Sequence, residues 1–185
     1  MKLIVGISGA TGAIYGIRLL QALKDCQVES HLVLTDNGKR TIVTETGYTV
    51  KEVEDLADSV YDSLDIGAPI ASGSFKTDGM IIAPCSIKSL SGLANSYNDT
   101  LLIRAADVVL KEQRKLVVIP RETPLHIGHL RLLTAVAEMG GVILPPMPAF
   151  YHMPKSIDDI VNQTVGKALD QFNIEHKLFP RWEGK

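Results

Sequence analysis

The sequence predicts one α/β domain with a doubly wound, mainly parallel sheet, in the three-layer arrangement of Rossmann-like and flavodoxin-like folds. Short apolar runs alternate with helix-like segments throughout the 185 residues. None of these runs alternates polar with apolar residues, which is typical of strands buried on both faces. Repeated β-α-β order with right-handed crossovers places helices on both sides of such a sheet. We expect the domain to cover residues 1–185, with a C-terminal tail over about 173–185.

The expected strands are short segments rich in isoleucine, leucine and valine. In chain order they cover residues 3–7, 30–34, 79–83, 115–119 and 142–144. Ligands of such sheets bind beyond the carboxyl ends of the strands. The residues that directly follow these segments are therefore the first candidates for a binding site.

Three of the expected helices show apolar residues at helical spacing. They cover residues 13–24, 100–114 and 125–139, the last of them after Pro124. Two further helices are indicated by the spacing of a capping box, in which Thr or Ser is followed by an acidic residue three positions later. These helices are expected to begin after Thr49 and after Ser156.

Composition excludes several classes of protein. The net charge of -2 argues against a nucleic-acid surface, which carries a basic excess. No apolar run approaches the roughly 20 residues of a membrane span, and the N-terminus does not resemble a secretory signal. Cys26 and Cys85 do not form a disulfide framework, so a reducing cytoplasm is the expected location.

The turn after the first strand, SGATG, predicts a ligand at the sheet edge. Its glycines at 6, 9 and 12 match neither the G-x-G-x-x-G dinucleotide motif nor the phosphate loop that ends in Lys. Thr35 stands after the second strand, where a ribose-binding Asp or Glu is expected for NAD. FMN, with one phosphate and no adenosine ribose, fits this pattern better than NAD.

Small hydroxyl residues after the first and third strands also favour an anionic ligand. Ser8 and Thr11 follow the first of these strands, and Ser86 and Ser89 follow the third. Helix N-termini attract anions through unpaired N–H groups and the helix dipole. Each hydroxyl taken alone is better explained as a helix cap, and only several of them at the same edge of one sheet favour a ligand.

Arg121 and Glu122 follow the fourth strand between two prolines. A guanidinium held there can grip a phosphate with its planar fork, and a partly buried Glu122 could transfer protons. The alternative is an exposed ion pair that contributes almost nothing.

Other candidate residues have plain alternatives. Arg104 and Lys111 share one helix face, which alone would be a solvated stripe. Tyr151 could donate to a phosphate or be a packed surface aromatic. His126 and His129 have a zinc-ligand spacing without a clear third ligand. Cys85 is read as a small buried spacer rather than a nucleophile.

Several motifs together resemble one family. The chain is similar to the UbiX-like flavin prenyltransferases, also labelled phenylacrylic or aromatic acid decarboxylases, within a flavoprotein superfamily that includes cysteine decarboxylases. The resemblance rests on GISGATGAIYGIRLL, SGSF, APCSIKSLSG, RAADVVLKE, PRETPLH, ILPPMPAFYH and FPRW. The chain departs from the family pattern at Thr11, where serine is common, at Lys167, where arginine is common, and in TDNGK after the second strand.

The resemblance implies a reaction, a cofactor and partners. Dimethylallyl phosphate would donate its prenyl group to N5 and C6 of reduced FMN, without a metal. The product would serve a UbiD-type decarboxylase, and the family assembles into homo-oligomers, with a dodecamer expected.

The resemblance also implies residue roles. Glu122 is the expected acid–base group, with Glu45 and Thr11 as a second polar relay. The FMN-binding residues would be Gly9, Ala10, Thr11, Thr35, Ser86, Ile87, Lys88, Ser89 and Arg121. The substrate phosphate would be bound by Tyr151, Lys167, Arg104, Lys111 and Arg121.

Two other functions share this fold. A decarboxylase that acts directly on an aromatic acid has less use for a cluster of phosphate-binding cations. A flavodoxin-like electron carrier is usually markedly acidic, unlike this chain. The sequence therefore favours the transferase over both.

Overall fold

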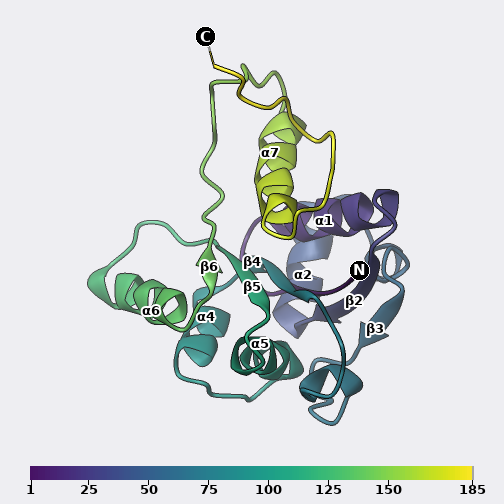
Figure 1. The fold of residues 1–185 in the computed structure, drawn as a ribbon, viewed down its shortest axis with the longest axis vertical. Coiled ribbons are helices and arrows are strands. Elements are labelled where there is room, and N and C mark those ends of the chain that lie inside the picture. Colours follow the sequence, from purple (N-terminus) through teal and green to yellow (C-terminus); the bar gives the residue numbers. More distant parts are fainter. Residues whose placement is uncertain (185) are drawn as a thin grey trace.

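The computed structural model describes residues 1–184 and contains one 6-stranded sheet with helices on both faces (Figure 1). The strand order is β3-β2-β1-β4-β5-β6, and every neighbouring pair is parallel. This is the Rossmann order rather than the flavodoxin order. The strands are β1 (Lys2–Ile7), β2 (Glu29–Leu34), β3 (Ser59–Tyr61), β4 (Gly79–Cys85), β5 (Lys115–Pro120) and β6 (Val142–Ile143).

The predicted helices are present, and the structure adds two more and a short 3-10 turn, η1 (Pro69–Ala71). Capping boxes begin α3 at Thr49 and α7 at Ser156, as the sequence predicted. The helices are α1 (Ala13–Asp25), α2 (Asp36–Glu45), α3 (Val50–Glu54), α4 (Ile87–Ala94), α5 (Leu101–Lys111), α6 (Ile127–Glu138) and α7 (Ile157–Asp170).

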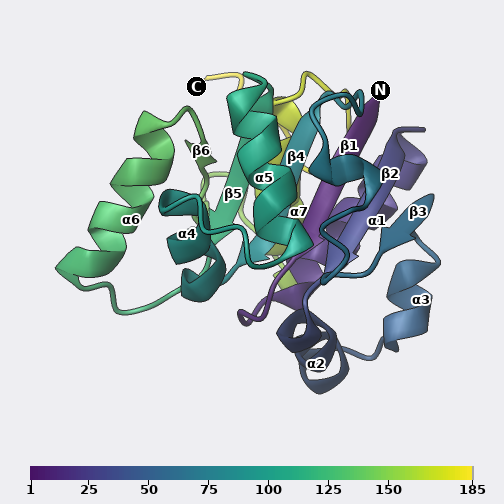
Figure 2. The same cartoon turned by 90° about the horizontal axis from the view of Figure 1, so that it is seen from below.

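Each face of the sheet has its own apolar core. In β1, Leu3 and Val5 pack toward α1 and α7, whereas Ile4 packs toward α5 on the other side. Figure 2 shows α5 in front of the sheet, with α1 and α7 behind it. Because both faces are covered, alternate strand residues are equally buried, which is why the strands read as unbroken apolar runs.

The chain after β6 leaves the sheet in an extended segment that ends near the start of α7 (Figure 1). We call residues 145–153 the arm. After α7 the tail, residues 171–184, returns toward the same end of the molecule without a helix or strand among these described residues. Within residues 1–184, no helix combines the length and apolar character that crossing a membrane requires.

Candidate active site

The candidate site lies where the sheet reverses its direction of winding. β1 pairs with β2 on one side and with β4 on the other, so the chain leaves these central strands toward opposite edges of the sheet. A crevice opens at such a switch point, beyond the carboxyl ends of the strands. The turns after β1, β2, β4 and β5 all meet there, as the sequence predicted.

Ser8 joins the turns after β1 and β4. Its buried hydroxyl donates to the Pro84 carbonyl oxygen at 2.9 Å and accepts from the Ser86 N–H at 2.7 Å. Ser86 in turn caps α4 by accepting from the Ser89 N–H. One side chain therefore fixes where α4 begins relative to the glycine turn.

Two glycines shape that turn. A Cβ atom on Gly9 would lie 2.2 Å from Asn37 Cβ, so only glycine lets the turn approach α2 this closely. Gly12 has a φ of 99°, in the left-handed region that other residues rarely adopt. The turn is thus held against the start of α2, next to Thr35.

Glu45 occupies the N-terminus of α1. Its Oε2 atom accepts from the Gly12 N–H at 2.7 Å and from the Ala13 N–H at 3.4 Å. A carboxylate there satisfies the unpaired N–H groups and the positive end of the helix dipole. Thr11 is exposed, and no hydrogen bond joins it to Glu45 within the described chain, so the expected relay between them stays a prediction.

A first cavity of about 390 Å³ lies between the N-termini of α2 and α4. We call it the switch-point cavity. Gly38 donates to the Thr35 hydroxyl and Ser89 to the Ser86 hydroxyl. Its lining residues are Gly9, Thr35, Asp36, Asn37, Ser86, Ile87, Lys88, Ser89, Thr100 and Glu122.

The first N–H groups of these two helices have no acceptor within their own helices. For residues 36, 37, 87 and 88 no other acceptor is recorded in the described part of the chain. The cavity therefore offers several free donors to an anion.

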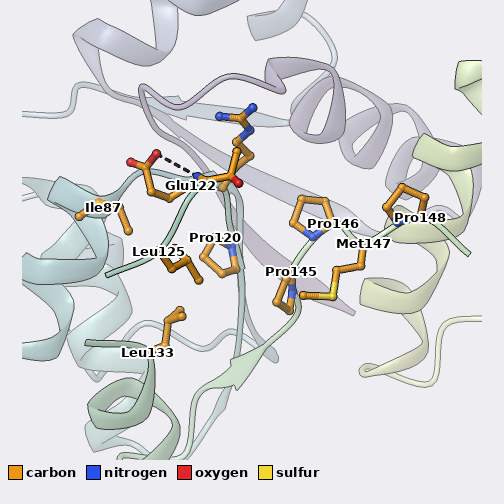
Figure 3. Close-up of a pocket in the computed structure, with 11 residues that line it drawn as sticks. Ile87, Pro120, Glu122, Leu125, Leu133, Pro145, Pro146, Met147 and Pro148 are labelled. Atoms are coloured by element: carbon orange, nitrogen blue, oxygen red, sulfur yellow. Dashed lines mark hydrogen bonds between the residues drawn. The ribbon is translucent and has the colours of Figure 1, made fainter. Parts of the chain in front are cut away.

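A second cavity of about 330 Å³ adjoins the first, because Ile87 and Glu122 line both. Figure 3 shows its apolar walls, with Leu125 and Leu133 on one side and the proline-rich start of the arm on the other. We call it the proline-walled cavity. Its lining residues are Ile87, Pro120, Arg121, Glu122, Thr123, Leu125, Leu133, Pro145, Pro146, Met147 and Pro148.

Arg121 brings a positive charge to this apolar cavity. Its N–H donates to the Cys85 carbonyl oxygen at 3.0 Å, which fixes the backbone where β5 ends. No ion pair of its guanidinium is recorded in residues 1–184. Burial raises the pKa of the Tyr15 phenol, while the hydrogen bond with Thr164 and the Arg121 charge oppose that shift.

Glu122 lies between the two cavities, and its Oε1 atom accepts from the Thr123 N–H at 3.0 Å. Figure 3 shows its carboxylate beside Ile87. The expected acid–base role depended on partial burial. In the single chain the Glu122 side chain is exposed. Its own chain therefore does not provide the burial that this role needs, and the acid–base role stays a prediction.

A third cavity of about 310 Å³ lies between the start of the arm and α7. It shares Pro145 and Met147 with the proline-walled cavity. Gln163, Thr164 and Lys167 line its α7 side. Neighbouring cavities thus share lining residues, Ile87 and Glu122 between the first two and Pro145 and Met147 between the last two.

Tyr151 lies at the far end of the arm and is 46% exposed. Its ring packs edge-on against Trp182 of the tail, with centroids 5.8 Å apart. It does not line any of the three cavities.

The comparison with known proteins decides the family. The Flavoprotein family model matches residues 1–169. The flavin prenyltransferase UbiX of Thauera aromatica is 61% identical over 184 residues, which cover 100% of this chain and 95% of the relative. The chain belongs to the UbiX flavin prenyltransferase family.

Two solved UbiX-like structures share the whole fold. A dodecameric FMN-dependent UbiX-like decarboxylase from Escherichia coli O157:H7 is 53% identical, with a TM-score of 0.97 and coverage of 100% of both chains. AnUbiX, in complex with FMN and dimethylallyl pyrophosphate, is 46% identical, with a TM-score of 0.98 and coverage of 100% of this chain and 98% of the other. The resemblance inferred from the motifs is confirmed.

Two cations expected from the UbiX family pattern lie outside the three cavities. Arg104 donates to the Ala71 carbonyl oxygen at 3.1 Å and pairs with Asp107 at 3.3 Å. Lys111 pairs with Glu112 at the last turn of α5, about 15 Å along the helix from its start. A single chain does not bring these residues together with Arg121, and their phosphate role stays a prediction.

The remaining candidates have structural explanations in this UbiX family member. Burial raises the pKa of the Cys85 thiol to about 12, so it is not an activated nucleophile. The His126 ring lies 3.6 Å from that of His129, but no group of three potential metal ligands is present within residues 1–184.

Sequence reasoning assigned no role to several lining residues. Thr100, directly before α5, and Asn37 line the switch-point cavity. Gln163 and Thr164 line the third cavity and are nearly buried. Gln163 lies four residues before Lys167, so the two residues share one face of α7. This spacing was the signal in the sequence that could have grouped Gln163 with Lys167.

Proposed function

We propose that the protein is a flavin prenyltransferase that joins the dimethylallyl group of dimethylallyl phosphate to N5 and C6 of reduced FMN. The observation that carries this proposal is the set of three neighbouring cavities that share lining residues. Free N–H donors line the switch-point cavity, Arg121 lines the proline-walled cavity, and Lys167 lines the third. The relatives named flavin prenyltransferase, and the related structure bound to FMN and an allylic diphosphate, support the same function.

The switch-point cavity fits the flavin phosphate. Its free donors belong to α2 and α4, whereas Glu45 already fills the N-terminus of α1. Because Gly9 has no Cβ atom, the turn leaves room at this cavity. Thr35 and Ser86 to Ser89 line the cavity and would surround the flavin phosphate. The apolar walls of the proline-walled cavity suit the flat ring system, with Ile87 between the two parts. When bound, reduced FMN supplies the electron-rich N5 and C6 atoms.

The cations act on the departing phosphate. As the allylic C–O bond breaks, negative charge grows on the phosphate oxygens, and positive groups placed there stabilise that charge. Arg121 supplies a planar fork and Lys167 a point charge. Tyr151, and Arg104 and Lys111 from a neighbouring copy, would complete the phosphate subsite. These groups replace the charge that a metal ion would otherwise supply.

Glu122 is placed to move protons. It borders both the cavity for the flavin phosphate and the cavity for the ring system. Joining the prenyl chain to both N5 and C6 would release one proton from each flavin position and consume one at the allylic double bond, and Glu122 or the released phosphate could exchange these protons. Glu45 and Thr11, at the glycine turn, would form the second polar relay.

The proposed assembly is a homo-oligomer, with a dodecamer as in the E. coli relative. Large apolar side chains are exposed on α6 and the arm, including Leu125, Ile127, Leu130, Met147, Phe150 and Met153. Such a surface suits contacts between copies. A UbiD-type decarboxylase in the cytoplasm would receive the product.

Mass spectrometry of the flavin tests this function directly. Purified protein, reduced FMN and dimethylallyl phosphate are incubated without oxygen, and the flavin is extracted. We expect a flavin heavier by one prenyl group, with chelator present or absent. Recovery of unmodified FMN alone would overturn the proposal, and parallel reactions with the diphosphate ester show which donor is used.

A further inference from the structure

Asp170, the last residue of α7, contacts two side chains of the tail and one of its own helix. Its carboxylate accepts from Arg181 in a two-point contact, with both N–O distances at 2.6 Å. His176 Nε2 lies 3.1 Å from Oδ1, and Lys167 Nζ lies 3.7 Å from Oδ2. The Asp170 side chain is 18% exposed, against 50% for Arg181. It therefore anchors the tail to α7 and also contacts Lys167.

The tail packs tightly where Asp170 holds it. A Cβ atom on Gly166 would lie 2.5 Å from the Phe179 ring and 2.6 Å from the His176 ring. The Arg181 guanidinium stacks over the Phe179 ring at 4.9 Å. These contacts fix the direction in which the tail leaves α7.

The tail then reaches the arm. Trp182 directly follows Arg181 and packs edge-on against Tyr151 at 5.8 Å. Asp170 is thus linked to two residues of the proposed phosphate subsite, to Lys167 directly and to Tyr151 through Arg181 and Trp182.

We propose that Asp170 is a positioning residue for the allylic phosphate subsite: it anchors the tail so that Trp182 holds Tyr151, and it orients the amine of Lys167. This inference rests on the proposed function, in which Tyr151 and Lys167 bind the substrate phosphate. Asp170 itself does not contact the substrate in this arrangement.

Two substitutions separate anchoring from simple charge effects. Asp170→Asn removes a negative charge near the phosphate, and Arg181→Gln removes a positive one, but both break the same two-point contact. An effect of charge alone would move phosphate affinity in opposite directions in the two variants. Loss of the anchor weakens affinity in both.

The first measurement is the affinity of FMN-loaded protein for dimethylallyl phosphate, by calorimetry, together with KM. We expect both variants to weaken binding about tenfold, the loss that one charge-assisted contact commonly produces, with FMN affinity unchanged. Asp170→Glu, which keeps the charge, restores most of the affinity. Asp158→Asn is the matched control on α7, because the recorded partner of Asp158 is Arg18 of α1, at 2.8 Å, and no hydrogen bond or ion pair joins Asp158 to residues 171–184, so this variant leaves affinity unchanged.

The second measurement uses Trp182, the only tryptophan in the chain. In the unmodified protein and in Asp158→Asn we expect limited quenching of its fluorescence by acrylamide. In Asp170→Asn and Arg181→Gln we expect quenching to increase, because the tail is released. This readout needs no turnover.

The results that overturn the inference are distinct from those that overturn the proposed function. Affinities that change in opposite directions, or quenching equal to that of the unmodified protein, overturn the positioning role. If Asp170→Asn does not fold, Arg181→Gln decides alone, because its side chain is half exposed. Tight dimethylallyl phosphate binding without prenylated flavin overturns the function instead, while the quenching comparison still tests the anchor.

Discussion

The turns at the sheet edge and the region of the arm and tail are held in different ways. The buried Ser8 hydroxyl joins two turns that are rooted in central strands. The arm instead depends on exposed aromatic packing, and the tail depends on one carboxylate at the end of α7. The proposed flavin end is thus built into the fold, whereas the proposed phosphate end depends on contacts outside the sheet.

The largest effect is expected for Arg121→Ala. Removing a charged donor from the departing phosphate should lower kcat/KM by about 10²–10³-fold, as for loss of a single preorganised donor. Arg121→Lys, which keeps the charge but loses the fork, should lose less. Turnover is measured by mass spectrometry of the flavin, and a loss in Arg121→Ala of less than tenfold contradicts the phosphate assignment.

Gly9→Ala tests the rigid end of the site. The new Cβ atom meets Asn37 Cβ at 2.2 Å, so the turn or α2 must move. We expect at least about tenfold weaker FMN binding and a free energy of unfolding lower by about 1–3 kcal/mol. Gly47→Ala is the control, because no atom lies within 4 Å of its Cβ position. Normal flavin titration of Gly9→Ala would show that the close approach is not required.

Ser8→Ala breaks the link between the two turns. The substitution leaves the Ser86 N–H without its partner, while the Pro84 carbonyl oxygen keeps only the Ser8 backbone N–H at 3.2 Å, and this should lower the free energy of unfolding by about 1–3 kcal/mol. Ser74→Ala removes an exposed hydroxyl and should change it by less than about 0.5 kcal/mol. Urea unfolding followed by circular dichroism measures both, and equal values would show that the link is weak.

Acid should release the tail at a pH below the ordinary pKa of an aspartate. Burial acts to raise the pKa of Asp170, but the Arg181 and His176 contacts outweigh it and hold that pKa below its ordinary value of 3.8. The anchor is therefore complete above pH 3.8 and is lost as pH falls through the lowered pKa. Acrylamide quenching of Trp182 against pH should show this step. Its persistence in Asp170→Asn would assign the step to another group.

The smallest effect is expected for Lys167→Arg. The residue is 48% exposed and both side chains carry one positive charge, so activity should stay within about twofold. The same turnover assay as for Arg121→Ala provides the comparison. A large change in Lys167→Arg would mean that the lysine has a role specific to its amine.

The sheet was largely predictable, because its central strands are buried on both faces and read as apolar runs. β3 was missed, since three residues at a sheet edge carry little pattern. α2 was missed because it buries only Gly38 and Ile42 among polar residues. The Rossmann strand order also could not be chosen over the flavodoxin order from the alternation alone.

The candidate site was predictable for residues whose place is determined by the strand that directly precedes them in the sequence. Residues after strands meet at one edge in any parallel sheet, so Gly9, Thr35, Ser86 and Arg121 could be grouped from sequence. Arg104 and Lys111 lie on α5 outside the three cavities, and the place of Tyr151 depends on the path of the arm, which no local pattern encodes. The link from Asp170 to Arg181 has no motif either, because it depends on how the tail turns back.

The carboxylate of Glu45 makes the N-terminus of α1 differ in charge from the other helix N-termini at the crevice. Glu45 fills the N-terminus of α1, whereas the first N–H groups of α2 and α4 have no recorded acceptor within residues 1–184, with the Asp36 carboxylate in the first turn of α2. A ligand with its negative charge at one end would be disfavoured beside Glu45 and would find open donors at α4 and α2. This difference between the three N-termini would favour one orientation of such a ligand.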